Sequence, residues 1–353
     1  MRSSSGQRVV DSATNWTAGT LLLIFVGFII NIGQGSPLRV ATCTIQRCQS
    51  FFPKMWAFTT LLAKRRANEI SQLNDTLDDA MCPNAGSSDP QTDTWTAIYG
   101  APIAERLNSQ APGANLVAAD ISNLIPLCAF ESIVKGVTSP FCALFTPAEF
   151  AQFEYFSDLD KYYGTGSVQQ ILSFISIPTM MTVYRYGQAL GPVQGVGYIN
   201  ELLARLTGKA VSDNTQTNRT LDASPDTFPL DRTLYADFSH DNQMIAIYAA
   251  LGLFNQSAPL DPTKPDPKRT WITSHLTPFS ARMVTERLSC TTRGGDGHIV
   301  KTGEYVRILV NDALQPLKFC GADKHGLCAL SDFVSSQGYA RNNGEGDFEK
   351  CFP

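Results

Sequence analysis

Two hydrophobic patterns meet near residue 240 of this 353-residue chain. From Leu234 to Phe238 every second residue is apolar, which predicts a strand with one buried face. From Met244 onward, apolar residues recur at the spacing i, i+3, i+4 and i+7, which predicts an amphipathic helix. Residues 239–242 therefore lie where a strand ends and a helix begins. Backbone N–H groups and the positive end of the helix dipole make such a junction suited to bind an anion.

The junction holds His240 and Asp241, which could serve as a phosphate ligand and a proton donor. The pattern alone favours a structural role for both residues. An aspartate at a helix start is usually an N-cap, and a single histidine beside it is usually part of the packing. A chemical role therefore needs support from outside the pattern.

Elsewhere the pattern predicts helices over roughly 90–165 and strands after 230. Residues 146–149 form a capping box with proline at the first helical position. Apolar spacing predicts further helices over 118–127 and 200–206, and a strand over 305–310 that ends in a turn. Residues 256–270 are rich in proline and charge, which predicts a surface loop. Together, the predicted helices and strands indicate an α/β sheet domain that carries a helical domain.

Composition narrows the class of protein. A formal net charge of −4 argues against a nucleic-acid-binding protein, which would show a basic patch. No cysteine or histidine spacing is typical of a metal site, so we expect no metal and no cofactor. Nine cysteines favour a secreted, oxidised glycoprotein when they occur together with four N-glycosylation sequons. The sequon asparagines are Asn15, Asn74, Asn218 and Asn255.

Longer motifs support a chemical role for the junction. Residues 235–242 read YADFSHDN and are followed by LGLFN at 251–255. Upstream the chain contains KYYG at 161–164 and LGPVQGVGYINEL at 190–202, and downstream it contains YVRILVND at 305–312. In this order the motifs resemble those of the fungal histidine acid phosphatases, and within that group the chain is most similar to the phytases. The resemblance covers about 1–19, 71–166 and 186–353.

The resemblance implies a phosphoglycerate-mutase-like α/β sheet domain flanked by helices, with a smaller, mainly helical domain. It implies that His240 binds the transferring phosphoryl group and that Asp241 protonates the leaving group. Arg2 would help to hold the phosphate, and Asn242 would line the pocket. The implied substrate is a small phosphomonoester, most of all phytate (myo-inositol hexakisphosphate). The implied protein is a secreted monomer that needs no metal and passes through a phosphohistidine.

The chain departs from the family at the nucleophile. The family motif R-H-G-x-R-x-P, whose histidine accepts the phosphoryl group, is absent. We therefore expect the chain as given to be inactive. Alternatives are a broad-specificity acid phosphatase and a non-catalytic secreted glycoprotein that binds polyphosphate. A membrane-tethered form would use the apolar run at 20–32, which is shorter than the roughly 20 residues that a bilayer span needs.

The resemblance also implies which cysteines are paired. The implied disulfides are Cys82–Cys351, Cys128–Cys142 and Cys320–Cys328. Cys290 would pair with a cysteine that precedes the family's nucleophile motif, and no such cysteine is present. Two further cysteines, at 43 and 48, are left over. We expect from this that the chain has lost its beginning.

Two segments, 20–70 and 167–185, interrupt the resemblance. Our hypothesis is that both are translated introns, and the alternative is genuine insertion. The expected organisation begins with a fragment of the α/β domain at 1–19, followed by the first insert at 20–70. A mainly helical domain at 71–166 and the second insert at 167–185 come next. The α/β domain with the His-Asp motif fills 186–353.

Overall fold

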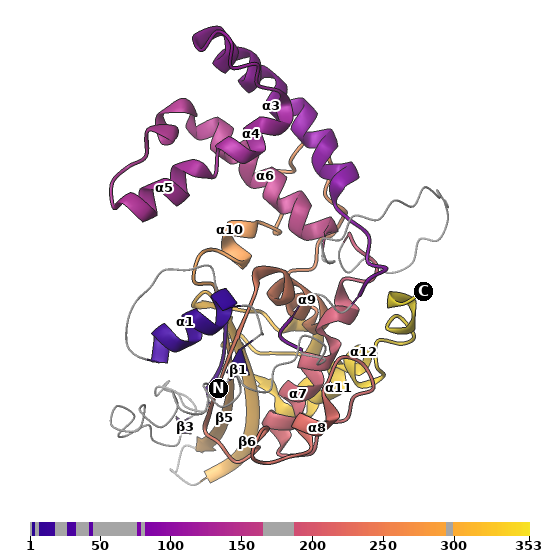
Figure 1. Cartoon of the computed structure of the whole chain (residues 1–353). Coiled ribbons are helices and arrows are strands. Elements are labelled where there is room, and N and C mark those ends of the chain that lie inside the picture. The colour runs from indigo at the N-terminus through magenta and orange to yellow at the C-terminus, as the bar shows by residue number, and fades with distance from the viewer. Residues whose placement is uncertain are drawn as a thin grey trace. The chain divides into compact units, whose positions relative to one another are not determined.

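The computed structural model describes residues 2–3, 7–17, 27–32, 42–44, 76–78, 82–164, 187–293 and 299–353. The chain divides into two compact units (Figure 1). The first unit is Met1–Asn84 with Leu190–Leu253 and Leu276–Pro353, and the second is Ala85–Ala189 with Phe254–His275. The second unit therefore includes the proline-rich loop at 256–270, which lies within the range that the sequence assigned to the α/β domain.

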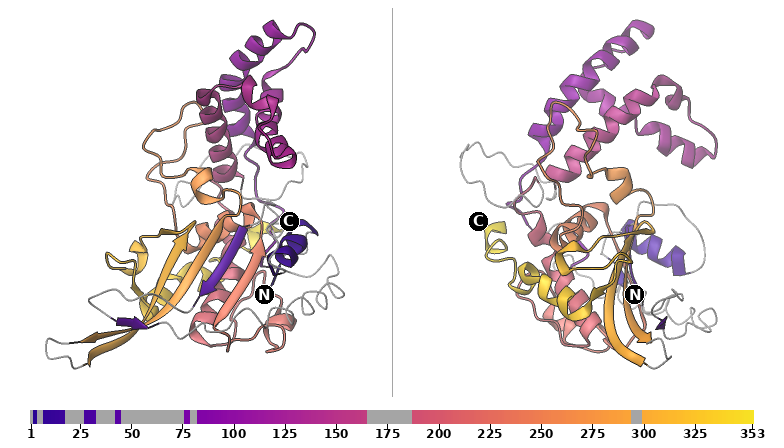
Figure 2. Two further views of the ribbon diagram at one scale, coloured as in Figure 1. Left: turned by 90° about the vertical axis from the view of Figure 1, so that its left-hand side faces the viewer. Right: turned by 180° about the vertical axis from the view of Figure 1, so that it is seen from behind.

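The first unit is built on a mixed sheet, whose strands lie side by side in the left view of Figure 2. Its order is β1-β4-β2-β5-β6-β7, with β3 paired to β5 and β8 paired to β6. β1 runs parallel to β4, β2 runs parallel to β5, and the remaining pairs are antiparallel. The strands are β1 (Arg2–Ser3), β2 (Gly27–Ile32), β3 (Thr42–Thr44), β4 (Leu234–Ser239), β5 (Arg282–Arg293), β6 (Ile299–Val310), β7 (Ala313–Leu314) and β8 (Cys328–Ala329).

Two of these strands come from 20–70, the segment that does not resemble the family. β2 lies between β4 and β5 in the sheet. β3 pairs with β5 in a register that places Cys43 opposite Cys290. Cys290 is disulfide-bonded, so the expectation that it lacks a partner is wrong. The reason is that pairing of β3 with β5 brings a leftover cysteine beside it, which the resemblance did not anticipate.

Helices complete the first unit. Val9 and Ala13 of α1 pack on Ala236 and Phe238 of β4, and this buries one face of that strand. α7 is buried from Val196 to Leu206, so the helix predicted over 200–206 begins four residues earlier. The helical elements are α1 (Gln7–Thr17), η3 (Pro192–Gly195), α7 (Val196–Thr207), α8 (Arg219–Asp222), α9 (Asp241–Leu251), η4 (Lys318–Cys320), α11 (Leu330–Ser336), α12 (Gly338–Arg341) and η5 (Glu349–Cys351).

The second unit is helical. Its α3 (Asp89–Gln110) packs against α4 (Ala118–Leu124) and α6 (Pro147–Tyr163). The predicted capping box starts α6, because Thr146 Oγ1 accepts a hydrogen bond from Glu149 N at 3.3 Å and Glu149 Oε2 accepts one from Thr146 N at 2.7 Å. The remaining elements are α5 (Leu127–Lys135), η2 (Pro140–Leu144) and α10 (Thr273–Leu276), whose last residue is assigned to the first unit.

The helix predicted over 118–127 is wrong at its end. α4 stops at Leu124, and a second helix, α5, begins at Leu127 with Pro126 as its N-cap. Proline has no N–H to donate to the preceding turn, so the helical hydrogen bonding is interrupted at this position. The apolar spacing continues across the break, which is why the pattern alone joined the two helices.

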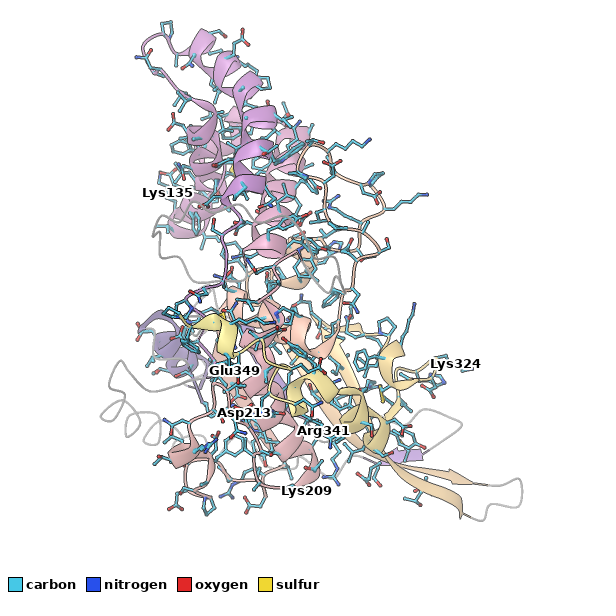
Figure 3. The ribbon with its side chains drawn as sticks, turned by 90° about the vertical axis from the view of Figure 1, so that its right-hand side faces the viewer. Lys135, Lys209, Asp213, Lys324, Arg341 and Glu349 are labelled. Atoms are coloured by element: carbon cyan, nitrogen blue, oxygen red, sulfur yellow. A yellow bond between two sulfur atoms is a disulfide. The ribbon has the colours of Figure 1, made fainter. Side chains whose placement is uncertain are left out.

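Three disulfides join the pairs that the resemblance implied. Cys82–Cys351 links residues 269 positions apart, Cys128–Cys142 spans 14 and Cys320–Cys328 spans 8. Lys324 extends to solvent from the loop closed by the last of these (Figure 3). Among the helices that the structure describes, none has the length and apolar character to cross a membrane.

Of the four sequons, two can be placed in full. Asn218 is the N-cap of α8, and its side chain accepts hydrogen bonds from Thr220 N at 3.1 Å and Leu221 N at 3.3 Å. Asn255 is exposed in the second unit. Asn15 lies in α1 with its side chain outside the described set, and Asn74 lies outside the described residues. Glycosylation stays a prediction.

Candidate active site

The predicted strand-to-helix junction is present. β4 ends at Ser239, and α9 begins at Asp241, with His240 as its N-cap in an extended conformation (φ −111°, ψ 163°). His240 contributes the first helical acceptor, because its carbonyl accepts a hydrogen bond from Met244 N at 3.0 Å. α9 ends at Leu251, and its C-cap Gly252 has a φ of +79°, a left-handed conformation that glycine adopts without strain.

Buried hydrogen bonds fix the junction on both sides of His240. The Ser239 hydroxyl donates to Leu77 O at 2.5 Å. Gln243 is fully buried, and its Nε2 donates to Thr76 O at 2.7 Å and to Gln194 O at 3.0 Å. Residues 76–78 and η3 therefore brace the first turn of α9. Gln243 was not among the predicted site residues, although its polar side chain on the buried face of the predicted helix was an available signal.

The three predicted residues at the junction are half-buried. His240, Asp241 and Asn242 retain partial solvent exposure, whereas Ser239 and Gln243 on either side are buried. A ligand can thus reach an imidazole, a carboxylate and an amide at the start of α9. The first N–H groups of a helix lack acceptors within it, so the same place favours negative charge. This arrangement suits an anionic substrate that needs a proton donor beside it.

The fourth predicted residue, Arg2, lies on β1, beside β4 in the sheet. β1 pairs with β4 so that Arg2 is opposite Asp237, and only 8% of Arg2 is exposed. Arg2 Nε is 2.9 Å from Asp237 Oδ1, and its Nη2 is 3.2 Å from Asp237 Oδ2 and 2.6 Å from Glu201 Oε2. Within the described part of the chain, Nη1 of Arg2 makes no such bond. Two of the three guanidinium nitrogens of Arg2 therefore bind carboxylates.

Arg2 belongs to a buried group that we call the Arg2 cluster: Arg2, Glu201, Arg205 and Asp237. Arg205 Nη1 is 2.5 Å from Asp237 Oδ2, so Asp237 is held between two guanidinium groups. Burial alone would raise the pKa of Asp237, but the two arginines hold it well below its usual range. Burial alone would lower the pKa of Arg2, but the carboxylates of Asp237 and Glu201 raise it further above its usual value.

Aromatic and hydroxyl groups complete the surroundings of the Arg2 cluster. The guanidinium groups of Arg2 and Arg205 lie 5.2 and 4.8 Å from the centre of the Phe228 ring. Arg205 is also 4.8 Å from the ring centre of Tyr235. The Thr76 hydroxyl donates to Glu201 Oε2 at 2.8 Å, so the segment that braces α9 also contacts this cluster.

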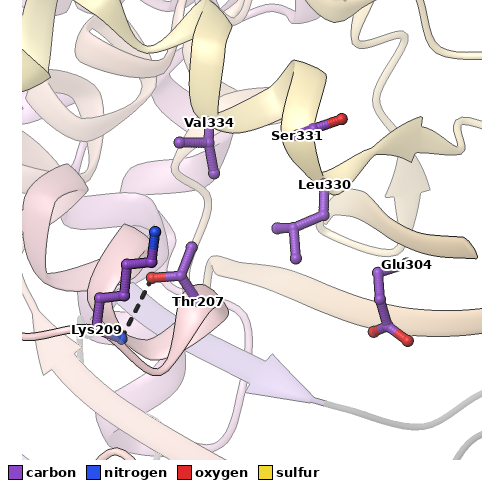
Figure 4. Close-up of a pocket in the computed structure, with 6 residues that line it drawn as sticks. All are labelled: Thr207, Lys209, Glu304, Leu330, Ser331 and Val334. Carbon is purple, nitrogen blue, oxygen red and sulfur yellow. Dashed lines mark hydrogen bonds between the residues drawn. The ribbon is translucent and has the colours of Figure 1, made fainter.

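Nothing in the described ranges resembles a metal centre, since no three His, Cys, Asp or Glu side chains are grouped to hold an ion. A cavity of about 410 Å³ lies elsewhere in the first unit, between the end of α7, β6 and α11 (Figure 4). Its lining residues are Thr207, Lys209, Glu304, Leu330, Ser331 and Val334. Because none of the predicted site residues lines it, this cavity is separate from the junction.

Comparisons with known proteins agree with the motifs. The family model of the histidine phosphatase superfamily (branch 2) matches residues 1–311. "Phytase A" of Emericella nidulans is 40% identical over 294 residues, which are 80% of this chain and 57% of that protein. "Phytase A" of Aspergillus oryzae is 38% identical over the same shares of the two chains. This chain thus spans little more than half the length of these curated relatives.

A solved structure supports the assignment. The crystal structure of the phytase from D. castellii is similar with a TM-score of 0.52 and 25% sequence identity. The match covers 76% of this chain and 48% of that one. The α/β fold class agrees with the match to the family model and with this structural similarity. The chain belongs to the histidine phosphatase superfamily, branch 2.

Proposed function

We propose that the junction of β4 and α9 is the proton-donating half of a phosphomonoesterase site, and that its substrate is phytate. Asp241 protonates the leaving alkoxide, which is a poor leaving group without that proton, and then accepts a proton from water. General acid–base help of this kind is worth about 10²–10⁴ in rate. His240 binds the oxygens of the transferring phosphoryl group, and Asn242 lines the pocket.

One observation carries this proposal. In a member of the histidine phosphatase superfamily, His240 and Asp241 lie half-buried at a helix start whose neighbours are fixed by buried hydrogen bonds. Arg2 is the least direct ligand, because two of its nitrogens bind carboxylates, and Nη1 is the one without such a bond among the described residues. The phytase relatives favour phytate, and the three disulfides favour an extracellular protein.

The reaction also needs a nucleophile that this sequence does not supply. None of its four histidines lies in an R-H-G-x-R-x-P motif. We therefore expect the purified chain to release no phosphate from phytate at acid pH. A chimera that adds the upstream segment of a Phytase A relative should hydrolyse phytate. Asp241→Asn should then abolish that activity, whereas the exposed control Asp226→Asn should not.

Binding by the chain itself separates the alternatives. Calorimetry with phytate should show weaker binding for His240→Ala. Asp241→Asn should bind as well as the wild type or better, because it removes a negative charge beside the phosphate. Retained binding with an inactive chimera would favour the polyphosphate-binding glycoprotein. Equal hydrolysis of phytate and p-nitrophenyl phosphate by the chimera would favour a broad-specificity phosphatase. A chimera active with Asn at 241 would contradict the proposed proton donor.

A further inference from the structure

The sequence contains a single Asn-Gly pair, Asn343 and Gly344, in the last part of the first unit. In such a pair the backbone nitrogen of the glycine can attack the side-chain carbonyl carbon of the asparagine, because glycine has no Cβ to hinder the approach. The attack forms a five-membered succinimide and expels ammonia. Water then opens the ring and leaves aspartate, or isoaspartate, in which the main chain runs through the Cβ atom.

The conformation of the turn explains why asparagine and glycine occur here. α12 ends in a Schellman motif, because Asn343 N donates to Ala340 O at 3.0 Å and Gly344 N donates to Tyr339 O at 2.9 Å. Asn343 has a φ of +53°, a left-handed conformation that asparagine adopts more readily than most residues. Gly344 has a φ of +77°, and a Cβ atom there would lie 2.6 Å from Val193 Cγ2. The turn therefore favours both members of the reactive pair.

The contacts of the turn oppose the reaction while the protein is folded. The attacking atom would be Gly344 N, which lies in a buried residue and donates its proton to Tyr339 O. The Asn343 side chain is held as well, because its Oδ1 accepts a hydrogen bond from Asn214 N at 2.9 Å. Ring formation needs a glycine nitrogen that has lost its proton and an asparagine side chain that is free to meet it. The turn must therefore open before the ring can form.

We propose that Asn343 is a site of spontaneous deamidation, and that opening of the turn at 339–344 sets its rate. One water enters and one ammonia leaves, so the chain gains a carboxyl group. Isoaspartate also lengthens the main chain by one carbon. The longer chain cannot keep both the bond from Gly344 to Tyr339 and the close approach to Val193, so this product fixes the turn in an open state. The inference does not depend on the proposed catalytic function.

The open state would also affect the support of the candidate active site. Val193, on which Gly344 packs, belongs to η3. The next residue of η3, Gln194, accepts a hydrogen bond through its carbonyl oxygen from the buried side chain of Gln243, at 3.0 Å. Deamidation at the turn therefore removes a packing contact from the segment that braces the first turn of α9.

The test follows deamidation and hydrogen exchange of the full chain in parallel. Both reactions need the Gly344 N–H to be released and deprotonated, so one opening equilibrium should slow both by the same factor. Two hydrogen bonds are lost on opening, which corresponds to a factor of roughly ten to a hundred. Peptide mapping should show that Asn343 deamidates more slowly in the native chain than in urea by this factor. Asn342, which precedes an asparagine, is the control and should react far more slowly than Asn343 in urea.

A variant that loosens the turn sharpens the test. Tyr339→Phe removes the hydroxyl that donates to Asp347 Oδ2 at 2.9 Å, across the same turn. In the native state, exchange at Gly344 and deamidation should both become faster by the same factor, while the rate of deamidation in urea should not change. The comparison of native chain with urea needs no variant, so the proposal stays testable if Tyr339→Phe fails to fold.

Three results would overturn the proposal. The first is equal deamidation of Asn343 in the native chain and in urea. The second is faster exchange at Gly344 in Tyr339→Phe without faster deamidation. The third concerns the isoaspartate form, which ion exchange separates by its added negative charge. The Gly344 amide of this form should have lost its protection from exchange, and retained protection would show that the turn has closed again.

Discussion

Asp237 and Asp158 are both fully buried aspartates, one in each unit, but their surroundings have opposite effects on the carboxyl group. Asp237 lies between the guanidinium groups of Arg2 and Arg205, and its pKa is far below the usual range. Among the residues that the structure describes, Asp158 accepts hydrogen bonds from Arg269 Nε at 2.7 Å and from the backbone N of Thr273 at 2.6 Å. Burial raises its pKa to about 6 despite these two donors. At Asp158 one guanidinium group does not offset the rise in pKa that burial causes, whereas at Asp237 two guanidinium groups do.

The contacts of Asp237 with its arginines therefore keep their charges in mildly acid solution, whereas the contact of Asp158 with Arg269 loses one. Asp158 joins α6 to the loop at 254–275, where Arg269 also lies 5.1 Å from the ring centre of Tyr155. The Tyr155 hydroxyl donates to Asp261 O at 2.7 Å in the same loop. This attachment of the loop contains a carboxyl group that titrates in mildly acid solution. The ion pairs of Asp237 stay charged across that range.

The largest effect is expected when Asp237, the carboxylate between Arg2 and Arg205, is replaced. Asp237→Asn leaves two buried guanidinium groups without their shared carboxylate. Removing one partner of a buried ion pair costs about 3–5 kcal/mol of the free energy of unfolding. Urea denaturation and hydrogen exchange in β4 measure the loss. Asp231→Asn, an exposed position before the same strand, is the control. A cost no larger than that of Asp158→Asn would contradict the comparison.

Asp158→Asn should have a smaller effect that depends on pH. The folded-state pKa of about 6 lies above the value for an unfolded chain, so the wild type loses stability as the pH rises from about 4 through 6. The Asn variant lacks this loss, which amounts to about 3 kcal/mol at most. Its stability relative to the wild type should therefore improve between pH 4 and pH 8, measured by hydrogen exchange in α6. The exposed Asp93→Asn should show no such trend.

The Phe228 ring that faces the two arginines should contribute less to the free energy of unfolding than the Asp237 carboxylate between them. Phe228→Leu removes the ring that faces both guanidinium groups and should cost about 2 kcal/mol, as desolvated cation–π contacts do. Phe145→Leu is the matched change in the second unit, where the buried ring packs edge-on against Phe150. Equal losses in denaturation midpoint would show that the arginines add nothing to the packing of Phe228.

The smallest expected effect concerns the start of the helix that carries Asp158. Thr146→Ala removes one half of the capping box and should cost about 1 kcal/mol. Hydrogen exchange at the Glu149 amide should rise, while the amide of Thr273, which donates to Asp158, should stay protected. Loss of protection at Thr273 would mean that the acid-sensitive contact depends on the first turn of α6.

Sequence patterns predicted those elements that form through interactions between residues close together in the sequence. The alternation in β4, the spacing in α9 and the box at Thr146 all act within a few residues, and the structure contains each of them. The Arg2 cluster could not be predicted in the same way, because Arg2 and Asp237 are 235 positions apart. The available signal was Asp237 itself, a charge inside an otherwise apolar strand.

Resemblance supplied what patterns could not. It placed a chemical role on His240 and Asp241, and it implied three disulfides that the structure contains. It also set aside 20–70, from which β2 and β3 join the sheet. Whether 20–70 and 167–185 are translated introns remains a prediction, which the sequence of the mature transcript would decide.

The disulfide between Cys82 and Cys351 closes a covalent ring that contains the whole second unit and the part of the first unit from Cys82 to Cys351. A single cut in the exposed loop at 256–270 would open the chain without releasing a fragment, since each new end stays tied through this bond. The cut protein would migrate as one species in a denaturing gel without reductant and as two once reduced. Limited digestion scored only under oxidising conditions would therefore make this chain look resistant to proteases when it is not.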